Sequence, residues 1–370
     1  MNFIPINRPL IGREERRNVD EVLESGILTD DTHQGGKYVR EFESKCRTLL
    51  GVKHVIALNS GTAALHASLI ACGVGEGDEV ILPSFTFVAT ANAVVACGGR
   101  PVFSDIRDDY NMDPADVRRK ITRRTKAIIP VHLYGYPAEM DELREMGGRQ
   151  SVSVIEDAAE SLGAEYRGRQ TGTLSNAGCF SLYATKVVTS GEGGAVSTND
   201  EEIAEKIRMI RNHGMVEGSD TRVLGYNFRM NEINAAVASA QIDKLSRFIE
   251  TRRENASFLT DQIRGVSGAT LTQTAEDRTH VWYLYTLRLS KNRGKVLDRL
   301  RSRSIGASVY YEAPVHHTPL YRKLGYSKVR LRVTEEAAAH VISVPVHPGL
   351  TEQERGHVAS ELKGALREFT

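Results

Sequence analysis

Short apolar runs typical of strands alternate with helical runs through the first half of the chain, and few folds accommodate this order. The strand-like runs lie at residues 54–58, 79–82, 101–105, 127–131 and 152–157. The helical runs between them lie at 63–72, 89–97, 114–120 and 139–146. Strands that alternate with helices form a mostly parallel sheet with helices on both faces. Two further strand candidates, 179–183 and 195–198, complete a predicted seven-stranded α/β sheet.

The segments on either side of this region differ from it. A helix at 13–25, a polar loop at 27–36 and a helix at 39–50 come first. A helix at about 201–211, a loop through 226 and one long helix from near 231 to beyond 253 follow the sheet. The tail mixes strands (282–289, 307–311, 341–346) with helices (295–303, 352–366). Because 370 residues exceed one compact core, we predict a large domain at 1–250 and a smaller α+β domain at 251–370.

Charge and apolar composition exclude several classes of partner. The chain has 48 lysines and arginines against 47 aspartates and glutamates, so no basic face for nucleic acid is expected. No apolar run is long enough to span a bilayer, and the first residues do not resemble a signal peptide. The four cysteines are scattered and are expected to be reduced. We therefore predict a cytoplasmic protein without nucleic-acid or membrane partners.

Lys186 and Asp157 are the first candidates for chemistry. Asp157 ends a strand-like run, at the sheet edge where α/β proteins bind ligands. Lys186 follows an apolar stretch on a short polar turn, and the glycine-rich run 191–194 comes next. A pyridoxal phosphate (PLP) site requires such a lysine for a Schiff base and such an acid to keep the ring nitrogen protonated. Burial is expected to lower the pKa of Lys186. The alternatives are a helix N-cap for Asp157 and a solvated surface lysine.

Two further segments suggest how a flat phosphorylated ligand could be held. Ser60-Gly61-Thr62-Ala63 opens a helix after the first strand, where backbone N–H groups favour a phosphate. An ordinary N-cap by Ser60 or Thr62 is the alternative, but Ser181 could supply a second phosphate ligand. Phe85 and Phe87 follow the second strand. One of them could stack on a planar ring, although the pattern alone favours both in the core.

Histidine and cysteine spacing predicts no metal site. Five histidines are candidates for a metal or catalytic role: His132, His213, His316, His317 and His347. None lies in an HExxH or zinc-like arrangement, and no G-x-S-x-G, P-loop or Rossmann glycine pattern occurs. Each of these histidines is therefore expected to be structural.

Taken together, the motifs resemble the DegT/DnrJ/EryC1/StrS family of PLP-dependent sugar aminotransferases over nearly the whole chain. The motifs run in this order: Ser60-Gly61-Thr62-Ala63-Ala64-Leu65, Pro83-Ser84-Phe85-Thr86-Phe87, Val131-His132-Leu133-Tyr134-Gly135, Ile155-Glu156-Asp157-Ala158-Ala159, Phe180-Ser181-Leu182-Tyr183-Ala184-Thr185-Lys186, Gly191-Glu192-Gly193-Gly194, Gly225-Tyr226-Asn227-Phe228-Arg229 and Pro345-Val346-His347-Pro348-Gly349. The family has the fold-type I, aspartate-aminotransferase-like architecture. The resemblance therefore implies that fold, with the mostly parallel sheet in the large domain.

The resemblance also implies a role for each matching residue. Lys186 would form the Schiff base and Asp157 would pair with the ring nitrogen. The other implied cofactor contacts are Phe87 stacked on the ring, Gly61, Thr62, Ala63 and Ser181 around the phosphate, Glu160 near the phenolic oxygen, and Asn227 reaching the neighbouring subunit's phosphate in a homodimer with shared sites. The implied substrate contacts are Arg229 for the donor's carboxylate, His316 or His317 near the sugar, and Thr29 in a substrate loop.

The implied reaction moves an amino group from glutamate or glutamine, through pyridoxamine phosphate, to a nucleotide-linked 4-keto-6-deoxy hexose. A 3-keto sugar or keto-inositol acceptor, or a non-catalytic regulator on the same scaffold, are the alternatives. Glu160 departs from the glutamine or histidine usual in the family, with an effect that the sequence does not define. Lys186 argues against the family branch that has histidine there and dehydrates sugars. The loops 29–34 and 215–224 are expected to select the sugar.

Overall fold

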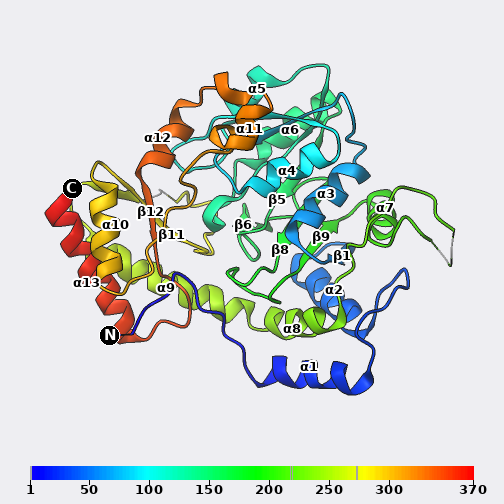
Figure 1. Cartoon of the computed structure of the whole chain (residues 1–370), viewed down its shortest axis with the longest axis horizontal. Coiled ribbons are helices and arrows are strands. Elements are labelled where there is room, and N and C mark those ends of the chain that lie inside the picture. Colours follow the sequence, from blue (N-terminus) through cyan, green and yellow to red (C-terminus); the bar gives the residue numbers. More distant parts are fainter. Residues whose placement is uncertain (1, 217, 219, 272–273) are drawn as a thin grey trace.

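A seven-stranded sheet forms the centre of the computed structural model, which describes residues 2–216, 218, 220–271 and 274–370 (Figure 1). The strand order is β1-β9-β8-β5-β4-β2-β3. The strands are β1 (His54–Leu58), β2 (Glu79–Pro83), β3 (Arg100–Ser104), β4 (Thr125–Ile128), β5 (Ser153–Asp157), β8 (Ala177–Ser181) and β9 (Gly194–Thr198). Neighbours from β3 to β8 pair in parallel, and β9 runs antiparallel to β8 and β1. The predicted mostly parallel sheet of seven strands is confirmed.

Helices cover both faces of this sheet, as the alternating side chains of β1 illustrate. Ile56 and Leu58 pack in one apolar cluster with residues of α3 (Gly61–Ala71), α4 (Val88–Ala96) and α7 (Glu201–Arg211). Val55 and Ala57 face the opposite cluster, with residues of α2 (Lys37–Leu50), α8 (Glu232–Ile242) and α9 (Leu245–Ile263). Successive side chains of a strand point to opposite faces, so the all-apolar β1 is buried on both sides.

Further elements of this region include α1 (Arg13–Ser25), α5 (Pro114–Lys120), α6 (Met140–Gln150) and the short hairpin of β6 (Glu165–Tyr166) and β7 (Arg169–Gln170). Residues of α5 and α6 pack in one apolar cluster with Ile81 of β2 and Ile128 of β4. The helix α1 packs along α8. Among the described residues, no helix has the length and apolarity needed to cross a bilayer.

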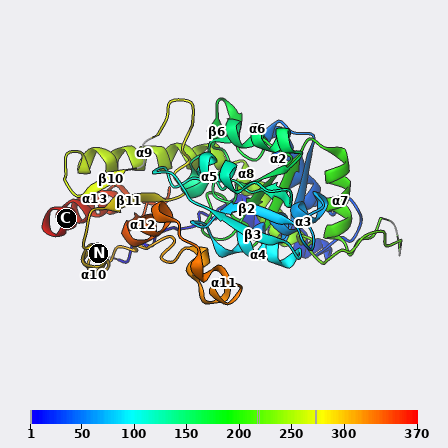
Figure 2. The ribbon, with the colours of Figure 1, turned by 90° about the horizontal axis from the view of Figure 1, so that it is seen from above.

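A second, three-stranded sheet lies at one end of the molecule, next to both termini (Figures 1 and 2). Its antiparallel strands are β10 (Ala269–Leu271), β11 (Tyr285–Leu289) and β12 (Val341–Val344). Residues of α9, α10 (Arg293–Ser302) and α13 (Glu352–Phe369) pack with them in a separate apolar cluster. Ile4 joins this cluster from the N-terminal segment. The division at 250/251 stays a prediction, and α9 runs continuously through that point.

Three expectations about individual elements were incomplete or wrong. The long helix predicted from 231 past 253 is two helices, α8 and α9, separated at Asp243 and Lys244, where Lys244 turns to bind Glu15 of α1 at 2.7 Å. The strand predicted at 307–311 is a single bridge between Ser308 and Ser343. The helices α11 (Pro319–Lys323) and α12 (Arg332–His340) were not predicted.

Candidate active site

Lys186 and Asp157 come together at the carboxyl edge of the central sheet. Asp157 is the last residue of β5, and Lys186 lies on the turn that follows β8, the neighbouring strand. The Lys186 side chain is 15% exposed, so the surface-lysine alternative is wrong. No helix begins after Asp157; its carboxylate instead accepts from the Ala159 N–H at 3.2 Å in a local turn.

Asp157 is held by a residue from a different element. Thr90 of α4 donates its hydroxyl to Asp157 Oδ2 at 2.8 Å, and Thr86 Oγ1 lies 3.1 Å from Thr90 Oγ1. Burial raises the pKa of Asp157, although the contacts with Thr90 and Ala159 and the charge of Lys186 oppose this shift. A carboxylate in this position would be stabilised by a cationic partner placed against its oxygens.

Glu160 is the carboxylate in contact with the lysine amine. Its Oε1 lies 3.7 Å from Lys186 Nζ and accepts from the Tyr311 hydroxyl at 2.9 Å. Its Oε2 accepts from the Tyr134 N–H at 2.7 Å. Burial raises the pKa of Glu160, and the charge of Lys186 opposes that shift. These contacts hold both carboxylate oxygens of Glu160, the residue that departs from the glutamine or histidine usual in the family.

The net direction of the Lys186 pKa shift is opposite to expectation. Burial does act to lower the pKa of the Lys186 amine, as predicted, but Tyr283, Glu160 and Asp157 raise it, and the net shift is upward. The amine lies 4.5 Å from the centre of the Tyr283 ring, and the Tyr283 hydroxyl is 3.0 Å from Thr185 Oγ1. The combined effect of these three neighbours on the pKa of Lys186 therefore outweighs desolvation.

The backbone is tightly packed where α3 begins. Ser60 caps the helix by accepting from the Ala63 N–H at 3.1 Å, which confirms the N-cap interpretation. A Cβ added at Gly61 would lie 2.8 Å from the Cβ of Ser181, so the predicted phosphate residues are adjacent. A Cβ at Gly194 would lie 2.3 Å from the Ser60 carbonyl oxygen. The glycines thus allow β8 and β9 to lie close to the start of α3. The backbone N–H groups at the N-terminus of α3 are suited to an anion.

The two phenylalanines after β2 have different environments. Phe85 is fully buried, as the core interpretation predicts, and its ring centre lies 6.1 Å from that of Tyr311. Phe87 is 58% exposed, its ring centre 6.3 Å from that of Tyr311. The expectation that both phenylalanines are in the core is therefore wrong for Phe87, whose face is available for a planar ligand.

These residues fit PLP by the chemistry of their side chains. The site has four groups that PLP requires. They are a buried carboxylate for the ring nitrogen, an amine for the aldehyde, an exposed aromatic side chain for the ring and a helix N-terminus for the phosphate.

The predicted substrate residues on the other side of β1 form a second group. Arg229 Nη1 donates to Asn212 Oδ1 at 2.7 Å, and Asn212 Nδ2 donates to the Asp31 carbonyl at 2.8 Å. This chain of bonds ties Arg229 to the loop that contains Thr29, which is exposed. Asn227 is also exposed, and its carbonyl accepts from Asn59 Nδ2 at 3.1 Å beside the start of α3. Residues 217 and 219 of the second substrate loop lie outside the described part.

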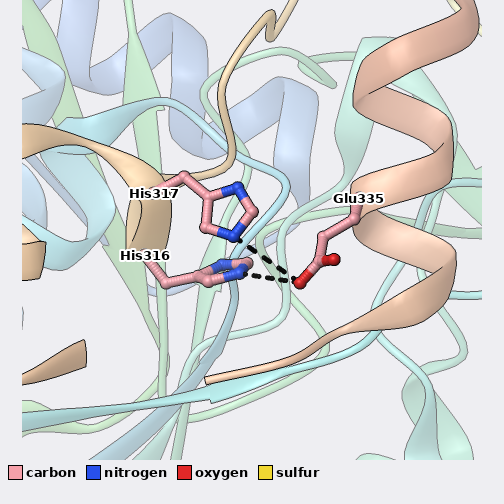
Figure 3. A group of neighbouring side chains, drawn as sticks. All are labelled: His316, His317 and Glu335. Carbon is pink, nitrogen blue, oxygen red and sulfur yellow. Dashed lines mark hydrogen bonds and ion pairs between the residues drawn. The ribbon is translucent and has the colours of Figure 1, made fainter. Parts of the chain in front are cut away.

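His316 and His317 lie on a short 3₁₀ helix, η2 (Val315–His317), and both point toward Glu335 of α12 (Figure 3). His316 is fully buried, and its Nδ1 lies 2.7 Å from Ser84 Oγ. Burial lowers the pKa of His316 to about 4. His317 is partly exposed. Of the two, His317 is therefore the one accessible to a substrate.

Thr90, Tyr283 and Tyr311 belong to the site but were not singled out from the sequence. Thr90 lies inside a helix, where threonine is unremarkable, and the two tyrosines lie far along the chain from Lys186. The adjacent pair Tyr310-Tyr311 before the 313–317 motif is the one pattern that could have pointed to them.

Known proteins resemble this chain over nearly its whole length. The family model for the DegT/DnrJ/EryC1/StrS aminotransferase family matches residues 9–363. The chain is 39% identical to a "pleiotropic regulatory protein" of Geobacillus stearothermophilus, over 96% of this chain and 95% of that protein. It is 36% identical to the GDP-perosamine synthase of Caulobacter vibrioides, over 98% of each.

Among solved structures, Helicobacter pylori PseC, an aminotransferase involved in the biosynthesis of pseudoaminic acid, superposes with a TM-score of 0.93 at 30% identity over 100% of both chains. The fold-type I architecture and the aminotransferase activity predicted from the motifs are thereby confirmed. The chain belongs to the DegT/DnrJ/EryC1/StrS family of PLP-dependent aminotransferases.

Proposed function

We propose that this enzyme transfers an amino group from glutamate or glutamine to a nucleotide-linked keto sugar of the 4-keto-6-deoxy hexose class. The observation that carries the proposal is the pairing of Lys186 with a buried Asp157 and Glu160 at one sheet edge. The named activities of the Caulobacter synthase and the Helicobacter aminotransferase support a sugar acceptor.

Each site residue has a defined part in this reaction. When bound, PLP supplies an electron sink that stabilises negative charge at the donor's α-carbon. Asp157 would hold a proton on the ring nitrogen, and Thr90 keeps the Asp157 carboxylate in place. Lys186 Nζ, as general base, would take the proton from the donor's α-carbon. Phe87 would orient the flat ring, and Gly61, Thr62, Ala63 and Ser181 would hold the phosphate.

The substrates would be bound by residues of the second group, with His317 near the sugar. Arg229 matches the donor's carboxylate because a guanidinium can make two parallel hydrogen bonds to it. The loop containing Thr29 would contact the sugar. Asn227 would reach the phosphate of the partner subunit in a homodimer, so that each site is built from both chains.

Direct assay of the purified protein tests the proposal. We expect the holoenzyme, incubated with glutamate and a panel of nucleotide-linked keto sugars, to add one amine to a 4-keto-6-deoxy hexose, as product mass would record. The panel includes 3-keto sugars and keto-inositols, and preference for one of these would replace the proposed acceptor. A protein that binds cofactor and sugar without any transfer would favour the regulatory alternative, which the name of the Geobacillus relative suggests but Lys186 and Asp157 disfavour.

Lys186→Ala isolates the covalent part of the proposal. We expect this variant to lose turnover and the visible absorption of the lysine-bound cofactor, because no other amine lies in the lysine's position. Borohydride treatment of the wild-type holoenzyme should fix a pyridoxyl group on Lys186, located by peptide mass spectrometry. Adduct formation at another lysine, or activity in the variant, would refute the assignment.

A further inference from the structure

His316, His317 and Glu335 lie close together, with both imidazoles directed toward the carboxylate (Figure 3). His316 Nε2 and His317 Nε2 lie 3.4 Å and 3.6 Å from the same oxygen, Oε1 of Glu335. One ligand atom from each of the three residues lies within 4.8 Å of the other two. With metal–ligand bonds of about 2.1 Å, ligand atoms of a tetrahedral zinc ion are separated by about 3.4 Å. The two nitrogen–oxygen separations, 3.4 Å and 3.6 Å, are close to this value.

The surroundings of His316 are those of a metal-binding imidazole. Its Nδ1 lies 2.7 Å from Ser84 Oγ, which also accepts from the His316 backbone N–H at 3.1 Å. A serine oxygen can accept two hydrogen bonds, so Nδ1–H can donate to Ser84 and leave the Nε2 lone pair free. Such a bond to the second ring nitrogen orients a metal-ligating histidine.

Glu335 would provide a negative charge for the ion, and His317 lies where an ion could enter from solvent. Glu335 Oε1 also accepts from the Leu331 N–H at 3.1 Å, which holds the carboxylate at the start of α12. The side chains of His317 and Glu335 are 28% and 31% exposed, whereas His316 is buried. An ion could therefore enter from the His317 side, with a fourth coordination position directed toward solvent.

We propose that His316, His317 and Glu335 form a binding site for a divalent transition-metal ion, with zinc the best match. Two imidazoles and one carboxylate suit zinc, cobalt and nickel, whereas magnesium and calcium prefer oxygen ligands alone. An ion there would tie the segment that contains Tyr311 to α12. Because Tyr311 donates to Glu160, the metal would restrain a residue in contact with the cofactor site.

The sequence spacing gave no indication of this site. His316 and His317 are adjacent, so neither follows the i, i+4 pattern of helical zinc ligands, and Glu335 comes from the next long helix. Without a metal, the same three residues would be a structural cluster in which both imidazoles donate to one carboxylate. Metal binding and this structural arrangement predict different results for conservative substitutions.

Cobalt and zinc titrations of the untagged holoenzyme test the proposal. We expect one Co²⁺ per chain with the visible bands of four-coordinate cobalt, displaced by Zn²⁺, and a thermal midpoint raised by Zn²⁺. Glu335→Gln keeps the shape and can still accept from Leu331, but it should lower Zn²⁺ affinity by more than about tenfold. His317→Ala, at a partly exposed position, should have the same effect while the chain stays folded.

His340→Ala is the matched control, because His340 lies on the same helix and its Nδ1 contacts the Glu336 carbonyl at 2.7 Å. This variant should bind zinc like the wild type. Failure of the wild type to bind Co²⁺ or Zn²⁺ more tightly than Glu335→Gln would overturn the proposal. Equal affinity in the wild type and His317→Ala would also overturn it. Neither result depends on the sugar substrate or on turnover.

Discussion

Glu160 places a second carboxylate beside the reactive amine, and its charge is one cause of the raised pKa of Lys186. Replacing Glu160 by glutamine removes that charge while keeping the size of the side chain. The pKa of Lys186 should then fall, so a larger fraction of the amine is neutral at a given pH. Only the neutral amine can attack the PLP aldehyde.

We therefore expect Glu160→Gln to take up PLP half-maximally at a lower pH than the wild type. The measurement is the rate of PLP uptake against pH, followed by visible absorption. Tyr311→Phe is the control, because it removes the hydroxyl that donates to Glu160 at 2.9 Å and leaves the carboxylate in place. An unchanged pH profile in Glu160→Gln would show that Glu160 does not set the charge of the lysine.

The buried charge of Asp157 is expected to lower the free energy of unfolding of the cofactor-free protein. Burial raises the pKa of Asp157 above its usual range, so the charged form costs free energy in the folded, cofactor-free protein at neutral pH. Asp157→Asn removes the charge; its one oxygen can still accept from the Ala159 N–H, and its NH2 group can donate to the Thr90 hydroxyl in place of the original bond. We expect an apoenzyme at least as stable as the wild type, but turnover reduced by about 100-fold or more, because the ring nitrogen loses its charge partner.

Thermal unfolding of the apoenzyme and steady-state transfer rates check the two halves of this prediction. If Asp157→Asn retained near-wild-type turnover, Asp157 would not be the partner of the ring nitrogen. If the apoenzyme were strongly destabilised, the loss of rate could not be assigned to chemistry.

At the scale of elements, the local sequence pattern predicted most of the helices and strands. The predicted bounds of α1 and α7 match the structure because Gly26 ends α1 and Asp200 caps α7. The division between α8 and α9 was not predicted; it coincides with the contact of Lys244 with Glu15 of α1, which is far away in the sequence. The isolated bridge at Ser308 likewise depends on its position beside β12.

Some residues of the candidate site could likewise be predicted from local sequence, whereas their contacts could not. Lys186, Asp157 and the start of α3 were recognisable because each lies at the end of a strand in a local motif. The contacts that tune them come from far along the chain. Tyr311 reaches Glu160 across 151 residues, and Thr90 reaches Asp157 across 67. The upward pKa shift of Lys186 is a sum over such long-range contacts, so burial inferred from flanking apolar residues gave the wrong sign.

The junction of β9 with α3 gives a prediction about elements. A Cβ at Gly194 would meet three backbone atoms, Ser60 O at 2.3 Å, Ser60 C at 2.4 Å and Gly61 N at 2.7 Å, none of which can rotate away. Gly194→Ala should therefore displace the first turn of α3, lower the free energy of unfolding by about 1–3 kcal/mol and weaken PLP binding. Chemical denaturation and PLP titration measure these effects.

Gly364→Ala is the matched control on α13, since a Cβ there meets nothing within 4 Å. Alanine in a helix interior should stabilise the chain by about 0.5–1 kcal/mol, with PLP affinity unchanged. Equal PLP affinity in Gly194→Ala and the wild type would mean that the start of α3 does not hold the phosphate.

At the scale of the whole molecule, the proposed role of Asn227 requires two chains. The Asn227 side chain is exposed, while its carbonyl is anchored to Asn59. If Asn227 serves the partner subunit's site, one subunit carrying Lys186→Ala and another carrying Asn227→Asp would form a heterodimer with one doubly altered site and one intact site. This follows from the two-fold symmetry of a dimer interface.

Mixing the two variants should therefore restore activity that neither has alone. Random exchange of subunits from an equal mixture makes about half of the dimers mixed, and each mixed dimer has one intact site out of two. Activity per chain should therefore approach about one quarter of the wild-type value. The control mixture combines Lys186→Ala with Asp157→Asn. Both residues act within one chain, at the carboxyl edge of its own sheet, so no intact site can form and this mixture should stay inactive. If native mass spectrometry showed complete exchange but the first mixture also stayed inactive, each site would be built from a single chain, and Asn227 would act within its own subunit.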